Sequence, residues 1–103
     1  DDNAFEFNKR GGVGAIGVTA NIAAKLASDF QKACVNDIDK ANNLDKLLQP
    51  LHSSLFIESN PSPVKYAASL LKMCSPEVRL PLVEIRDETK KKISEALKSA
   101  KLL

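Results

Sequence analysis

Residues 11–21 read Gly11-Gly12-Val13-Gly14-Ala15-Ile16-Gly17-Val18-Thr19-Ala20-Asn21. No other part of the chain joins glycines, β-branched apolar residues and a helix-start signal without a gap. The pattern predicts a loop, a short buried strand and the entry to a helix. Alternation along a strand places Ile16 and Val18 on one face, with Ala15, Gly17 and Thr19 on the other.

A single strand cannot form a sheet, and the rest of the chain has the patterns of helices and loops. The partners of this strand must come from residues outside the chain, from other copies of it, or from an unusual local pairing. The chain also begins at Asp1, and its one methionine is Met73. We therefore expect a processed, cleaved or truncated product of a longer protein.

Composition predicts one small soluble domain with a modest core. The chain has 103 residues, and 15 basic against 13 acidic residues give a net charge of +2. This balance argues against a nucleic-acid partner, and the absence of a long apolar run argues against a membrane one. The expected location is the cytoplasm. Cys34 and Cys74 lack the spacing of metal ligands and are predicted to be buried, reduced thiols.

Apolar residues at intervals of three and four predict four main helices. The first begins at Thr19 or Asn21 and ends near Val35. The second starts after Asp37, a suitable N-cap, and continues to Leu55 with a kink at Pro50. Asn60 is expected to cap a third helix that ends at Met73. An extended connector over residues 75–83 then leads to a last helix capped by Asp87, whose buried face carries Ile93, Leu97 and Ala100.

The residues alone predict no catalytic constellation, no metal site and no cofactor in this segment. Gly12, Gly14 and Gly17 match the G-x-G-x-x-G spacing, but the strand-like residues fall inside the motif instead of before it, which argues against a dinucleotide site. His52 has no carboxylate placed to orient it, so we expect a packing or surface role. Asp1 and Asp2 are adjacent and form a poor acid–base pair. No lysine has the apolar surroundings of a Schiff-base nucleophile.

Five segments in register resemble the C-terminal third of the 4-hydroxy-tetrahydrodipicolinate synthase (dihydrodipicolinate synthase) family. The resemblance covers nearly the whole chain. The segments are residues 11–21, Leu48-Gln49-Pro50-Leu51-His52 with Leu55-Phe56-Ile57-Glu58-Ser59-Asn60-Pro61, Pro63-Val64-Lys65-Tyr66-Ala67, Arg79-Leu80-Pro81-Leu82, and Ala100-Lys101-Leu102-Leu103.

This resemblance implies an α/β fold, in which residues 1–20 are the end of a (β/α)8 TIM barrel and residues 21–103 a C-terminal helical domain. The eighth strand would be residues 14–19. The resemblance implies a lyase, commonly homotetrameric in this family, that condenses pyruvate with L-aspartate 4-semialdehyde through a Schiff base, in lysine and diaminopimelate biosynthesis. Its Schiff-base lysine and relay tyrosine lie upstream, so this segment alone is expected to be inactive. The pyruvate contact falls on Ile16, and Gly17 replaces the usual serine of the family.

Two other readings stay open: another pyruvate-dependent class I lyase of the N-acetylneuraminate lyase family, or a non-catalytic helical module. A piece of the lyase, whose partner is the remainder of the barrel, predicts that Val18, Leu26 and Phe30 are unpacked in this chain. A helical module predicts a self-contained four-helix core with the glycine-rich strand frayed.

Overall fold

The computed structural model describes residues 1–103 and contains helices but no strand. None of its helices has the length and hydrophobicity needed to cross a membrane. The regular elements are α1 (Ala4–Lys9), the 3₁₀ turn η1 (Thr19–Asn21), α2 (Ala24–Asn36), α3 (Ile38–Ser54), α4 (Ser62–Leu70) and α5 (Asp87–Ser99).

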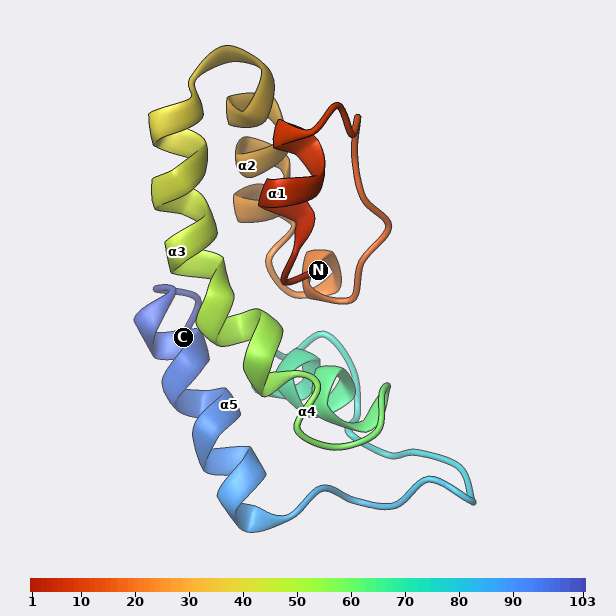
Figure 1. Ribbon diagram of the computed structural model, residues 1–103. Helices are drawn as coiled ribbons and strands as arrows, with labels where there is room; N and C mark the ends of the chain where they lie inside the picture. Colours follow the sequence, from red (N-terminus) through yellow and green to blue (C-terminus); the bar gives the residue numbers. More distant parts are fainter.

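Helix α3 is the spine of an elongated molecule that measures 41 × 26 × 21 Å. Helices α1 and α2 lie beside its first half, α5 packs against its second half, and α4 packs against α5 (Figure 1). The Asp37 carboxylate accepts a hydrogen bond from the backbone N–H of Lys40 at 3.2 Å, which confirms the predicted cap. The helix continues past Pro50 to Ser54, as the unbroken apolar spacing predicts.

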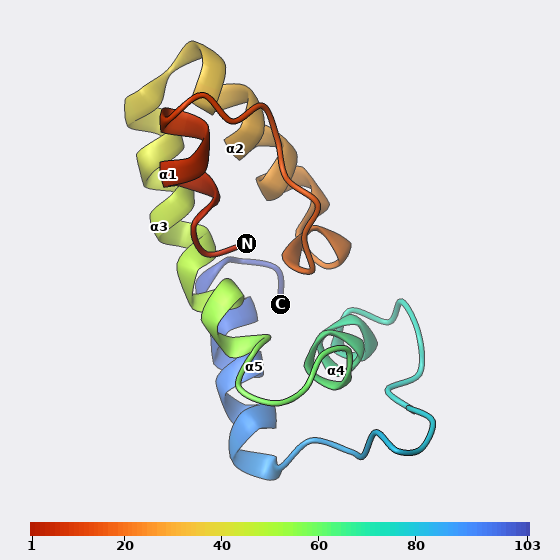
Figure 2. The same ribbon diagram turned by 45° about the vertical axis from the view of Figure 1, so that its right-hand side comes forward.

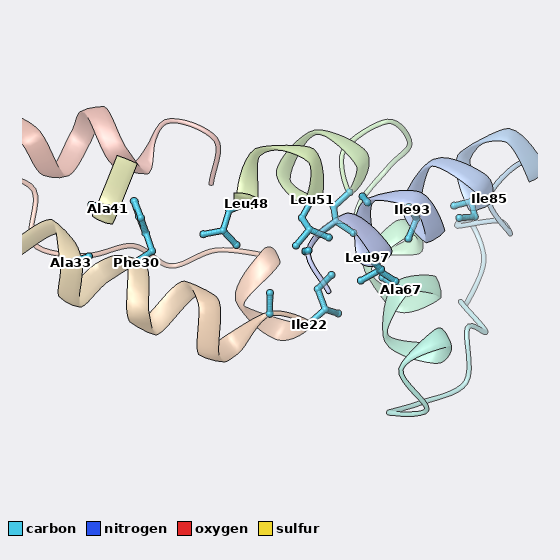
Figure 3. Close-up of a cluster of buried hydrophobic side chains, with 14 residues drawn as sticks. Ile22, Phe30, Ala33, Ala41, Leu48, Leu51, Ala67, Ile85, Ile93 and Leu97 are labelled. Carbon is cyan, nitrogen blue, oxygen red and sulfur yellow. The ribbon is translucent and has the colours of Figure 1, made fainter. Parts of the chain in front are cut away.

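The hydrophobic core is a row of side chains that follows α3 (Figure 3). Phe30 and Ala33 of α2 cover the first half of α3, and Ile93 and Leu97 of α5 cover the second. Leu48, Leu51 and Leu55 of the α3 segment are completely buried between them. Their spacing of three and four places them on one face, so a single helix unites the two parts of the core.

Several helix boundaries differ from the predicted ones. The first long helix begins at Ala24, because Thr19 and Asn21 are taken up by the separate turn η1. Helix α4 begins at Ser62, with Pro61 at the N-cap position, so Asn60 is not the cap. Asp87 is the first residue of α5 and Arg86 is its N-cap. Residues 75–83 hold no helix or strand, in agreement with the predicted connector.

The strand predicted within residues 14–19 is not formed in this chain. Residues 12–17 have no regular structure, and Thr19 already belongs to η1. The backbone groups of residues 13–17 make no hydrogen bond with any other part of the chain. A strand requires a neighbour with which to exchange such bonds, and no segment of this chain provides one. The α/β character implied by the resemblance is therefore absent from these residues.

The side chains around Phe30 are packed, contrary to the expectation for a piece of the lyase. Val18, Leu26 and Phe30 were expected to be unpacked, yet Phe30 is only 4% exposed, and Val18 and Leu26 pack against the core. The reason is α1, whose Phe5 ring meets the Phe30 ring edge-on at a centroid distance of 6.2 Å. The first residues of the chain thus cover the face that was expected to lie open.

The two cysteines are free, but they are not the buried thiols that the sequence predicts. Cys74 is exposed and Cys34 only half-buried. Cys74 follows the end of α4 and enters the irregular connector, where no helix face packs it against the core.

Candidate functional site

A pocket of about 280 Å³ lies beside the glycine-rich stretch. The extended segment of residues 12–17 runs along α2 (Figure 2), and the pocket lies between this segment, α2 and α3. Ala15 and Gly17 of the segment, Phe30 of α2, and Leu48 and His52 of α3 are among its lining residues. Ala15 and Gly17 therefore lie beside this pocket, whereas Val13, two residues before Ala15, is fully exposed.

The carboxylate of Asp1 fixes the end of the segment. Its Oδ2 atom accepts hydrogen bonds from the backbone N–H groups of Val18, at 2.7 Å, and Thr19, at 3.2 Å. These groups begin η1 and have no backbone partner of their own. A Cβ added to Gly17 would lie 1.7 Å from Asp1 Oδ1. Serine, the usual residue of the resembled family, would therefore force the Asp1 carboxylate to turn away.

Thr19 and His52 form the polar centre of the pocket wall. Thr19 Oγ1 lies 2.7 Å from His52 Nδ1, a hydrogen bond that joins η1 to α3. Burial lowers the pKa of His52, against the opposing carboxylates of Asp45 and Asp2. His52 is therefore neutral at pH 7. Of the packing or surface roles predicted for His52, its burial shows packing, while its threonine partner could not be seen in the sequence.

Ile16, the predicted substrate contact, is fully exposed and does not line this pocket. Its neighbours Ala15 and Gly17 do line it, so Ile16 lies on the opposite face of the extended segment. The pocket side holds one neutral imidazole already bonded to a hydroxyl, and one carboxylate bonded to two amides. These hydrogen bonds engage only Nδ1 of His52 and Oδ2 of Asp1. The hydrogen bonds of Asp1 and Thr19 thus hold the end of the segment, while the Ile16 side chain is left open to solvent.

Residues 1–100 match the family described as the dihydrodipicolinate synthetase family. The chain belongs to that family. It is 64% identical over 107 aligned residues to the 4-hydroxy-tetrahydrodipicolinate synthase of Pelagibacter ubique (strain HTCC1062), which it covers to 36% of its length. It is 53% identical over 105 residues to the synthase of Zymomonas mobilis, again over 36% of that protein. The chain thus spans little more than a third of these curated relatives.

Solved structures of the family show the same arrangement of helices. The dihydrodipicolinate synthase of Thermotoga maritima superposes with a TM-score of 0.95 at 34% identity, over 99% of this chain and 35% of that one. The synthase of Acinetobacter baumannii, solved in complex with pyruvate, superposes with a TM-score of 0.93 at 35% identity, over the same shares. The resemblance drawn from the five segments is therefore confirmed at the level of the family.

Proposed function

We propose that this chain is the C-terminal part of a 4-hydroxy-tetrahydrodipicolinate synthase. That lyase condenses pyruvate with L-aspartate 4-semialdehyde through a Schiff base, to give 4-hydroxy-tetrahydrodipicolinate in lysine and diaminopimelate biosynthesis. The observation that carries the proposal is the 64% identity to the Pelagibacter ubique synthase over the whole chain. The Schiff-base lysine would come from the part of the enzyme that precedes Asp1, so residues 1–103 alone would be inactive.

In this proposal residues 1–20 end a TIM barrel, residues 14–19 form its eighth strand, and residues 21–103 are the C-terminal helical domain. The unpaired backbone of residues 13–17 supports this role. Unpaired N–H and C=O groups are costly to bury, so a segment that carries a row of them is ready to accept a strand on either side. Residues of α1, α2 and α3 line the pocket on the other side of the segment.

Ile16 would then form one wall of the pyruvate site. Its side chain is fully exposed on the face turned away from α2 and α3, which is the face that a closed barrel would turn inward. An apolar β-branched side chain there would hold the methyl end of a small 2-oxo acid by contact alone. The assembled enzyme is proposed to be a cytoplasmic homotetramer that needs no cofactor.

The test is to join the part of the Pelagibacter ubique synthase that precedes the aligned region to residues 1–103, and to assay the product, called below the assembled enzyme. We expect condensation of pyruvate with L-aspartate 4-semialdehyde. Borohydride reduction in the presence of pyruvate should add the mass of the reduced adduct to a lysine upstream of Asp1. The 103-residue chain alone should show neither reaction.

Within the assembled enzyme, Ile16→Ala should raise the KM for pyruvate about tenfold, since lost methyl contacts in a small pocket have effects of that order. The matched control is Val35→Ala, which shortens an exposed apolar residue on α2. A folded assembled enzyme that traps no pyruvate would contradict the lyase proposal and favour the helical module. Trapping of pyruvate without condensation would show that residues 1–103 complete the pyruvate site but not the rest of a synthase active site.

A further inference from the structure

The hydrogen bond between Thr19 and His52 is the one fully buried contact between two polar side chains in the chain. Thr19 is 1% exposed and His52 is 7% exposed. Their positions are 33 apart in the sequence, and their Oγ1 and Nδ1 atoms are 2.7 Å apart. A buried polar atom without a partner is costly, so each residue of this pair depends on the other.

This contact lies where the extended segment meets the helical part. Residues 13–17 make no hydrogen bonds of their own, so the segment is held at its ends. At the Ile16 end the anchors are the Asp1 carboxylate, which binds the backbone of Val18 and Thr19, and the Thr19 hydroxyl, which meets His52. The contact with His52 ties the segment directly to α3, whereas Asp1 is connected to α3 only through the Asp2 carbonyl, which accepts a hydrogen bond from Gln49.

We propose that His52 is a positioning residue of the pyruvate site, which acts through Thr19 to hold Ile16 in place. The inference rests on the proposed function, in which Ile16 contacts pyruvate. His52 lines the pocket on the helical side of the segment, whereas Ile16 lies on the opposite face. His52 therefore does not touch the substrate. Its effect is transmitted along the three-residue step from Thr19 back to Ile16.

The experiment measures steady-state kinetics of Thr19→Val and His52→Leu in the assembled enzyme, because both variants keep the approximate volume and remove the hydrogen bond. We expect the KM for pyruvate to rise about five- to tenfold, the size set by one lost buried hydrogen bond. The kcat should change by less than about twofold, since no reacting group is touched. The double variant should be no worse than either single one, because both remove the same contact.

Variants that keep the hydrogen bond should keep the KM for pyruvate low, and this outcome links the KM to the hydrogen bond itself. Thr19→Ser keeps the hydroxyl, and His52→Asn places an amide where Nδ1 lies, so both should keep the KM within about threefold of the parent. The matched control is Thr89→Val, which makes the same change at a fully buried threonine at the start of α5. It should leave the KM for pyruvate unchanged even if it lowers the melting temperature.

An unchanged KM in Thr19→Val, or an equal rise in Thr89→Val, would overturn the inference. If the apolar variants do not assemble, His52→Gln carries the test, because it keeps a polar side chain but moves its hydrogen-bonding atoms by about one bond length. A raised KM with an unchanged melting temperature then supports the inference, and an unchanged KM overturns it. A parent enzyme that never traps pyruvate removes the proposed function itself, whereas an active parent with insensitive variants removes only the role of His52.

Discussion

The buried imidazole of His52 makes the stability of the chain depend on pH. Burial lowers the pKa of His52 below its ordinary value of about 6.5. The unfolded chain therefore binds more protons than the folded one between the two pKa values. Stability is fully present above the ordinary value and is lost as the pH falls through the folded one.

We expect urea unfolding of the 103-residue chain, followed by circular dichroism, to show this loss between pH 7.5 and pH 5. The contribution of one proton is at most about 1.4 kcal/mol per pH unit. His52→Asn has no titrating ring and should flatten the slope in this range, although it lowers the stability at pH 7.5. A variant with the same slope as the parent would show that other groups cause the pH dependence.

Among the elements, α5 depends on a residue that lies far from it in the sequence. Glu58, which follows α3, accepts a hydrogen bond from the backbone N–H of Arg86 at 3.0 Å, and Arg86 is the N-cap of α5. The nearby Thr89 hydroxyl and the backbone N–H of Arg86 both lower the pKa of Glu58. The distance and angles from Thr89 Oγ1 to Glu58 are outside those of an ordinary hydrogen bond. A carboxylate at the positive end of a helix is stabilising.

Glu58→Gln should therefore lower the melting temperature of the chain at pH 7, because it removes this charge from the start of α5. Since the pKa of Glu58 is lowered, its contribution is present above about pH 4.3 and is lost as the pH falls through the folded value. The difference in melting temperature between the parent and Glu58→Gln should therefore become smaller as the pH falls below about 4.3. The control is Glu95→Gln, an exposed carboxylate farther along α5. Equal melting temperatures for Glu58→Gln and the parent at pH 7 would contradict the capping role.

Local patterns predicted α3 well, because both its N-cap and the spacing of its apolar residues depend on residues close together in the sequence. Asp37 stands directly before the helix, and Leu48 and Leu51 follow the helical repeat. The contacts of Glu58 with Arg86 and of Thr19 with His52 could not be predicted in this way, since each joins residues that the fold, not the spacing, brings together. The resemblance supplied the family and pointed to Ile16, but the side of the segment on which Ile16 lies became visible only with the helices in place.

The molecule as a whole has a packed helical core and one extended segment, residues 13–17, whose backbone is unpaired. Its core is continuous along α3, although Phe7 of α1, Val35 of α2 and Ile38 of α3 keep exposed apolar side chains. The extended segment differs, because its backbone groups and the Ile16 side chain are left open. The chain therefore combines the self-contained core expected of a helical module with the unpaired segment expected of a piece of a barrel.

Amide hydrogen exchange can distinguish an unpaired segment in the isolated chain from a paired strand in the assembled enzyme. In the isolated chain the amides of residues 13–17 donate no hydrogen bond, so they should exchange as fast as those of an unstructured peptide. In the assembled enzyme the same amides should become protected, since strands on either side would pair with them. The measurement is mass spectrometry of peptides that cover residues 11–21, with peptides from α3 as the reference that stays protected in both samples. Rapid exchange of residues 13–17 in an active assembled enzyme would contradict their placement as the eighth strand, because a strand inside a closed barrel has no free edge.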